Sequence, residues 1–232
     1  MPENPKESGA APTPRTRVRR LAENARYDGE TVRRIVDAAW VCHIAFTDDA
    51  GSVHCLPMAC WRLAGHLHIH GAKGSRLIKA LQSGREAAVT ITHVDGLVLA
   101  RSAFNHSMNY RSVAVYGRFE AVPAEDKAAA LAALLEHLAP GRQEQVRAGS
   151  AQELAGTTVL RLSLAEAAAK VRSGPPIDDA EDLALPVWAG VLPLHIARDP
   201  AQADPACDPA AAANPPEHVQ RWPGGADNPG QR

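Results

Sequence analysis

The chain lacks the features that would place a protein in a membrane, outside the cell or on nucleic acid. No apolar run reaches the length of a membrane-spanning helix, and no N-terminal run resembles a signal peptide. The formal net charge of −1 excludes the basic surplus typical of nucleic-acid-binding domains. The 4 cysteines form no Cys-x-x-Cys pair and no disulfide-framework spacing. We therefore expect a cytoplasmic protein with free thiols and with neither nucleic-acid nor membrane partners.

Two common nucleotide-binding motifs are missing as well. The absence of Gly-x-Gly-x-x-Gly argues against a Rossmann dinucleotide site, and no Walker A sequence is present. Residues 1–24, rich in proline and arginine, are predicted to be a disordered or loosely docked N-terminal arm, and residues 196–232, rich in proline, alanine and aspartate, a disordered C-terminal tail. One folded domain over residues 25–195 remains, which is long enough to bury a core.

Short strands and a few helices alternate within this domain. Asp28 is expected to cap a helix over 29–39, and Ser150 with Glu153 forms a capping box for another helix. Asp95-Gly96 predicts a type I′ turn. Further helices are predicted over 75–83 and 124–138, and strands over 41–47, 52–60, 61–63, 66–70, 87–94, 97–102, 112–121 and 158–164, the last being the final core strand. Helical crossovers cannot join all these strands, so the predicted fold class is mainly β with α, a small β-barrel decorated with helices.

Residues 66–79 carry the strongest chemical signal. An alternating strand runs into a Gly-Ala-Lys-Gly turn, and Ser75 follows at the N-cap position of a helix. Glycines allow the turn to aim backbone N–H groups at one point, and the neighbouring cations add positive charge. The segment predicts a phosphate site, with an ordinary connection and solvated cations as the alternative. The residues concerned are Gly71, Lys73, Gly74, Ser75 and Arg76.

A second group of polar residues interrupts the apolar strands at 103–113. Hydrogen-bonding side chains held on a rigid sheet are what a ligand site needs. This segment therefore predicts donors for a ligand, with a polar surface loop as the alternative. Its polar residues are Asn105, His106, Ser107, Asn109, Tyr110, Arg111 and Ser112.

Four motifs, in this order, resemble the pyridoxamine 5′-phosphate oxidase-related flavin-nucleotide-binding proteins: residues 66–79, 94–102, 106–117 and 170–176. The resemblance extends from about Arg17 to Leu194. It implies an FMN-binding split β-barrel, usually a homodimer with FMN at the subunit interface. The nitroimidazole-resistance reductases are similar proteins on the same fold.

The resemblance also implies roles for single residues. Ser75-Arg76 matches the pair that holds the FMN phosphate, with Lys73 beside it, and His70 matches a residue placed against the flavin. Arg111-Ser112 matches an Arg-Gln step, where serine implies a shorter or water-mediated contact. The Arg-x-His motif that grips the vitamer in the true oxidases is absent near 171–194, where Arg172 is the nearest cation. Pyridoxamine phosphate is therefore not the expected substrate.

These observations predict an FMN-dependent oxidoreductase, a homodimer, that acts on a small molecule not identified by the sequence. Its catalytic residues are unassigned, with His70 and His106 as candidates for proton handling because imidazole titrates near neutral pH. The predicted cofactor-binding residues are His70, Gly71, Lys73, Ser75, Arg76, His106, Asn109, Tyr110, Arg111 and Ser112.

Two alternatives remain open at this point. A protein of this kind can hold flavin without turnover, as a carrier or sensor. Alternatively, the three histidines on one strand face, with His54 or Cys60 nearby, could bind zinc or haem; these are His66, His68 and His70. No metal site is assigned.

Overall fold

The computed structural model describes residues 9–197 and 199–220, and within them the chain forms one antiparallel sheet of 10 strands. The strands are β1 (Ala25–Arg26), β2 (Val41–Thr47), β3 (Val53–Leu63), β4 (His66–Ala72), β5 (Glu86–Leu99), β6 (Ser107–Arg118), β7 (Glu120–Ala121), β8 (Thr157–Ser163), β9 (Ala167–Arg172) and β10 (Gly190–Pro193). Their order is β1-β9-β6-β5-β2-β3-β4-β8-β7, and β10 pairs with β5.

Helices and short 3-10 turns connect and cover these strands. The helices are α1 (Gly29–Asp37), α2 (Arg76–Gln82), α3 (Lys127–Leu138), α4 (Ala151–Gly156), α5 (Pro209–Ala213) and α6 (Glu217–Gln220). The 3-10 turns are η1 (Ala22–Asn24), η2 (Ala103–Asn105), η3 (Arg142–Glu144) and η4 (Asp182–Ala184). No helix among the described residues combines the length and apolarity needed to cross a bilayer.

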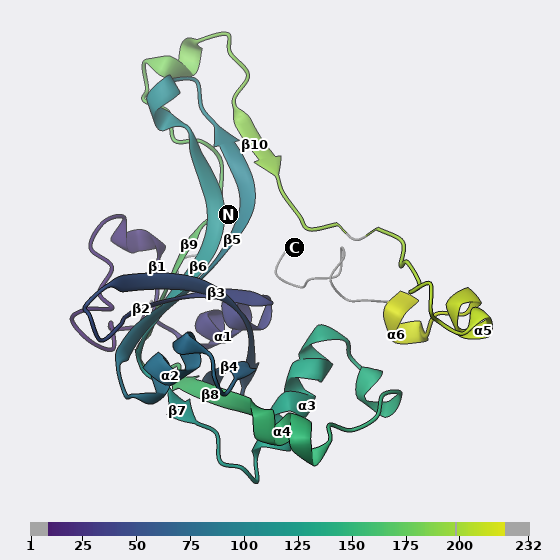
Figure 1. Ribbon diagram of the computed structural model, residues 1–232. Helices are drawn as coiled ribbons and strands as arrows, with labels where there is room; N and C mark the ends of the chain where they lie inside the picture. Colours follow the sequence, from purple (N-terminus) through teal and green to yellow (C-terminus); the bar gives the residue numbers. More distant parts are fainter. Residues whose placement is uncertain (1–8, 198, 221–232) are drawn as a thin grey trace.

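The molecule has two regions, a barrel and an arm (Figure 1). The sheet curls into the barrel, whereas β5 and β6 continue beyond it as a long hairpin with β10 alongside. We call this hairpin, residues 95–110, together with residues 173–193, the arm. Figure 1 shows α2 at the side of the barrel away from the arm, so the two lie at opposite ends of the molecule.

Two predicted helices, α1 and α2, pack against the barrel and contribute buried side chains to the main core. Asp28 caps α1 as predicted, because its carboxylate accepts from the backbone N–H of Thr31 at 2.7 Å. Helix α2 buries one face against the barrel, with Leu77, Ile78 and Leu81. It lies close to β4 at Gly71, where a Cβ atom would be 2.9 Å from Cγ1 of Ile78. Glycine is therefore needed at this contact, as well as in the turn that follows.

A smaller core lies between α3 and the barrel. Trp61 is fully buried there against Ala130 and Leu134 of α3 and Val159 of β8. The capping box of Ser150 and Glu153 is confirmed at α4. The four cysteines are free.

The prediction of a type I′ turn at Asp95-Gly96 is wrong. Strand β5 continues through it, with a register shift against β6 between Val94 and Gly96. The carboxylate of Asp95 accepts two bonds from the Arg111 guanidinium at 2.8 Å, and Gly96 backs against β10. These tertiary partners favour a β-bulge over a turn. The chain reverses instead around η2, so β6 begins at Ser107, before the predicted start at 112.

Three other expectations about strands are also settled. Segments 52–60 and 61–63 form a single strand, β3. Among the described strands, residues 53–59 of this strand pair with β2 alone, so the half of β3 that contains Pro57 is a sheet edge, where a missing N–H is tolerated. Strand 158–164 is not the last of the core, since β9 follows with Ala167, Ala168 and Ala169 buried. Alanine favours helix, so the sheet context, not intrinsic propensity, forms β9.

Residues 9–24, which we expected to be disordered or loosely docked, contact the barrel. Thr16 is buried, and the Arg15 guanidinium bonds Glu86 at 2.7 Å and Glu166 at 2.5 Å. Long-range charge pairs of this kind do not appear in a local composition pattern. The expected tail includes the short helices α5 and α6. Residues 1–8, 198 and 221–232 lie outside the described part of the chain, and so do the expectations about them.

Candidate functional site

The turn between β4 and α2 presents three polar side chains without partners among the described residues. Lys73 and Arg76 are exposed and make no ion pair there, and Ser75 occupies the N-cap without a side-chain capping bond. The backbone contributes less than expected, because the N–H of Lys73 donates to Gly156 O at 3.0 Å and that of Ser75 to Ala72 O at 2.9 Å. We call Lys73, Ser75 and Arg76 the cradle; its anion-binding groups are side chains.

Next to the cradle, strand β4 carries its histidines into the smaller core. The His68 ring stacks on Trp61, with ring centroids 5.6 Å apart and an interplanar angle of 26°. The ring of His70 lies 5.9 Å from that of Trp61. Burial lowers the pKa of both histidines, so each is neutral at pH 7.

Two buried nitrogens in this cluster have no hydrogen-bond partner in the described part of the chain: Nδ1 of His70 and Nε1 of Trp61. Buried polar atoms in proteins are nearly always satisfied, so each such atom calls for an explanation. A bound group beside His70 would supply one.

The set of side chains considered as an alternative metal site is not assembled among the described residues. His54 instead bonds the Asp48 carboxylate at 2.9 Å and stacks on Phe46. Within the described residues there is no group of three or more His, Cys, Asp or Glu side chains placed to hold a metal ion. His66 and His68 do lie on the same face, with ring centroids 6.3 Å apart.

The second predicted group, 106–112, lies on the arm and where the arm meets the barrel. It is therefore distant from the cradle within one chain (Figure 1). His106 Nδ1 lies 2.9 Å from Ser102 O. Asn109 donates to Gly174 O at 3.1 Å and accepts from Arg172, and Arg111 is held by Asp95. These groups mainly hold the arm together, and a single chain does not join the two halves of the predicted site.

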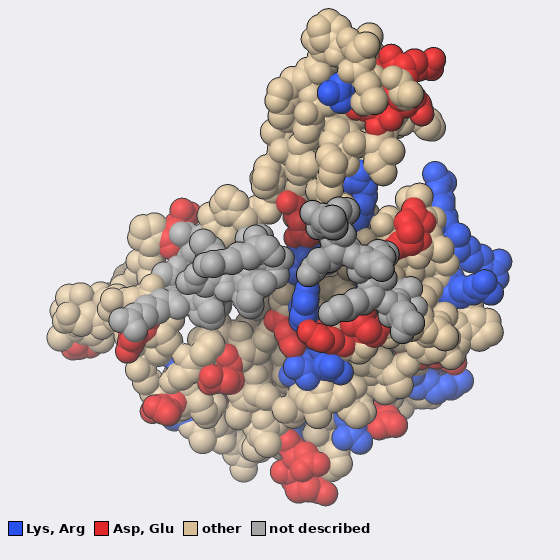
Figure 2. Space-filling model, turned by 180° about the vertical axis from the view of Figure 1, so that it is seen from behind, with Lys and Arg blue, Asp and Glu red and all other residues tan. Residues whose placement is uncertain are grey.

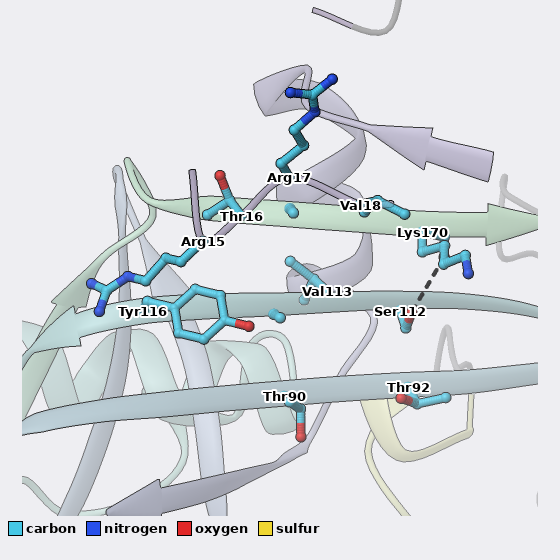
Figure 3. A pocket seen from close by; sticks show the side chains of 12 residues that line it. Arg15, Thr16, Arg17, Val18, Thr90, Thr92, Ser112, Val113, Tyr116 and Lys170 are labelled. Carbon is cyan, nitrogen blue, oxygen red and sulfur yellow. Dashed lines mark hydrogen bonds between the residues drawn. The ribbon is translucent and has the colours of Figure 1, made fainter. Parts of the chain in front are cut away.

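Ser112 faces a cavity of about 340 Å³ between the N-terminal segment and the outer face of β5, β6 and β9 (Figure 3). Hydroxyl side chains are common in its lining, so we call it the hydroxyl-lined cavity. Arg15 extends beside the Tyr116 ring there, 5.1 Å from its centroid. Its lining residues are Arg15, Thr16, Arg17, Val18, Thr90, Thr92, Ser112, Val113, Ala114, Tyr116, Ala168 and Lys170.

Sequence reasoning missed most of this cavity. Thr90 and Thr92 alternate with buried Val89 and Ile91, so period 2 alone places their hydroxyls on the outer face. The place of Arg15 in the lining of this cavity could not be predicted from the sequence, because ion pairs with the distant Glu86 and Glu166 hold it there. Its guanidinium holds the pKa of Glu166 down at about 2, helped by Thr13, which donates to the same carboxylate.

The sequence matches one family over more than half of its length. Residues 28–171 match the family described as pyridoxamine 5′-phosphate oxidase, and the chain belongs to this family. The resemblance seen in the sequence and the predicted fold class, mainly β with α in a split β-barrel, are therefore confirmed.

Two solved structures are similar over nearly their whole length. The flavocytochrome Anf3 from Azotobacter vinelandii is 40% identical, with a TM-score of 0.86, over 91% of this chain and 98% of that one. The FAD and heme binding protein from Mycobacterium smegmatis is 33% identical, with a TM-score of 0.81, over 85% of this chain and 96% of that one.

More distant matches bear on the fold alone. A candidate 5-nitroimidazole antibiotic resistance protein from Bacteroides thetaiotaomicron is 21% identical, with a TM-score of 0.54, over 63% of this chain and 86% of that one. No curated protein matches the chain.

Proposed function

We propose that this protein binds a flavin nucleotide, and that the cradle holds the phosphate next to the ribityl chain. The observation that carries this proposal is the cradle itself: two cations and a hydroxyl meet at the start of α2 without partners among the described residues. Two relatives at 40% and 33% identity, a flavocytochrome and an FAD-binding protein, support it.

The proposed flavin is FMN, and the proposed activity is that of an oxidoreductase acting on a small molecule. FAD carries the same first phosphate, so the cradle serves either nucleotide. A bound flavin supplies hydride and electron transfer. The protein side chains position and tune it. The Lys73 and Arg76 cations neutralise the phosphate, and neutral His70 beside the cradle has a ring nitrogen free to hydrogen-bond or to take a proton.

A second copy of the chain would complete the site. Within one chain the cradle and Ser112 face different regions, so we propose a homodimer in which the hydroxyl-lined cavity of one protomer faces the cradle of its partner. The apolar surface of the arm supports association, since Phe104 is 95% and Trp188 64% exposed. Figure 2 shows that uncharged side chains cover most of the arm and that Lys and Arg side chains gather around its base.

Haem is a second candidate ligand, and a specific observation favours it. The two relatives above are a flavocytochrome and a FAD and heme binding protein. Haem iron needs a neutral imidazole nitrogen, and half-buried His70, whose buried Nδ1 has no partner among the described residues, lies next to Trp61. His70 would then help to hold the haem, which would supply electron transfer to and from the flavin.

Titration of the purified protein with riboflavin, FMN, FAD and haemin tests these proposals by absorption and fluorescence. Flavin binding requires FMN or FAD to bind more tightly than riboflavin, because only the nucleotides carry the phosphate. Haem binding requires a Soret band that His70→Ala removes while the flavin spectrum remains. Failure of all four ligands to bind would overturn both proposals. Oxidation of reduced nicotinamide with a range of acceptors separates an enzyme from a carrier or sensor.

A further inference from the structure

Three arginines from three different elements surround a second cavity, of about 150 Å³. Arg26 comes from β1, Arg34 from α1 and Arg111 from β6. Thr31, Ile35 and Val171 complete the lining. We call this the arginine-lined cavity. It lies where α1 packs against the sheet.

Carboxylates near this cavity balance only part of its charge. The Arg111 side chain is 16% exposed, and Asp95 neutralises it. Arg26 donates to two backbone oxygens, those of Glu23 and Ala25, at 2.8 and 2.7 Å. The exposed Arg34 side chain makes no ion pair or hydrogen bond among the described residues. Two guanidinium charges therefore face the cavity without a carboxylate bonded to them.

One further carboxylate lies near the cavity. Asp28 caps α1 by accepting from the N–H of Thr31, and its charge interacts with that of Arg26, which it therefore balances in part. His93 Nε2 lies 3.1 Å from Ile35 O and so points at the backbone of that helix. The Thr31 side chain also hydrogen-bonds the Asp28 carboxylate, so Arg34 is the cavity cation whose side chain has neither a carboxylate nor a hydrogen-bond partner among the described residues.

We propose that the arginine-lined cavity binds a phosphate group. Like charges brought together repel one another unless an anion lies between them, and guanidinium forks match phosphate oxygens in geometry. The small volume suits a single phosphate, either free or at the end of a phosphomonoester. Within one chain this site is apart from the cradle, because β5, β2 and β3 separate β6 from β4, which leads to the cradle.

Calorimetric titration with inorganic phosphate tests the site, with chloride at equal ionic strength as the reference. The full-length protein is titrated as wild type and with Arg76→Ala, so that phosphate bound in the cradle is separated from phosphate bound here. We expect the site to bind with a dissociation constant of about 1 mM or lower in both proteins. Arg34→Gln should weaken that binding at least tenfold, roughly the value of one charge-assisted contact, and Thr31→Val should weaken it less.

The matched control is Arg33→Gln, the neighbouring exposed arginine on α1, which does not line the cavity. It should leave phosphate binding within about twofold, since it changes only the general field. Thermal unfolding of each variant checks that it is folded. Titration with glycerol 3-phosphate distinguishes a phosphomonoester from free phosphate as the ligand. Binding tighter than that of inorganic phosphate indicates a phosphomonoester, and weaker binding indicates the free ion. The proposal is overturned if the Arg76→Ala protein binds no phosphate, or if Arg33→Gln and Arg34→Gln weaken binding equally.

Discussion

Strands β5 and β6 run through both the barrel and the arm, yet their apolar side chains are buried in the barrel and exposed in the arm. In the barrel half of β5 and β6, Ile91 and Val113 are each only 2% exposed. In the arm half, Leu97 is 40% and Met108 46% exposed. Helices cover the first half, whereas only β10 joins the second. The barrel therefore covers its apolar side chains with its own elements, whereas the arm presents an apolar surface suited to contact with another molecule.

The largest expected effect contrasts two positions on β5. Ile91→Ala should lower the free energy of unfolding by about 2–5 kcal/mol, because it removes buried apolar contacts and leaves a cavity. Leu97→Ala should lower it by less than about 1 kcal/mol, since the side chain is already partly in water. Urea denaturation of both variants checks the difference. Equal losses would mean that the arm is as tightly packed as the barrel.

A charge on the arm should act on association instead of on folding. Phe104→Asp places a carboxylate at a side chain that is 95% exposed, so we expect the proposed dimer to dissociate at least about tenfold more readily and to lose the proposed flavin as it does so. Val53→Asp is the control, at an apolar side chain on the barrel that is 76% exposed. Sedimentation at micromolar concentration measures both. A monomer that retains flavin stoichiometrically would contradict the shared site.

The cradle predicts a change confined to one ligand. Arg76→Ala should weaken FMN about tenfold and leave riboflavin unchanged, because a charge-assisted contact to phosphate contributes roughly 1.5–3 kcal/mol. Lys73→Ala should act in the same direction but less, since an ammonium makes no fork. Lys79→Ala is the matched control, an exposed cation of α2. Fluorescence titration gives the constants, and equal weakening of both ligands would assign Arg76 to a structural role.

The smallest expected effect concerns pH. Hydrogen bonds from Arg15 and Thr13 lower the pKa of Glu166 to about 2, so the folded state favours the carboxylate. The stabilisation from Glu166 is therefore complete above the unfolded pKa of 4.5 and is lost as pH falls from there through 2. Glu166→Gln should flatten the pH dependence of unfolding in that window. Glu181→Gln, on the arm, should leave the dependence as in the wild type.

Local patterns were enough to predict the parts of the fold that local interactions decide. The cap at Asp28, the box at Ser150 and the position of Ser75 each depend on a few neighbouring residues, and all three are where the sequence places them. Membership of the family was likewise visible from ordered motifs. The side chains of the cradle were predicted from their residue types, but the predicted role of the backbone was not found, because the N–H groups of Lys73 and Ser75 bond other backbone oxygens.

Features that depend on distant partners were not predictable. Asp95-Gly96 has the composition of a turn, but Arg111 and β10 hold it in a bulge. The alanines of β9 favour helix, yet they pair with β6 and β1. Arg15 resembled part of a solvated arm until Glu86 and Glu166 were found beside it. In each case a contact far along the chain outweighs local preference.

The pairing of β4 with β8 has a consequence for how the chain folds. It joins His66 to Ser163 and Ala72 to Thr157, so the whole β5–β6 hairpin and α3 lie within the loop that it closes. Closing a long loop costs more entropy than closing the short reversal at η2. We therefore expect the hairpin to form first and the barrel to close last. Pulse-labelling hydrogen exchange during refolding should protect Val113 before Leu160, and the reverse order would refute this sequence of events.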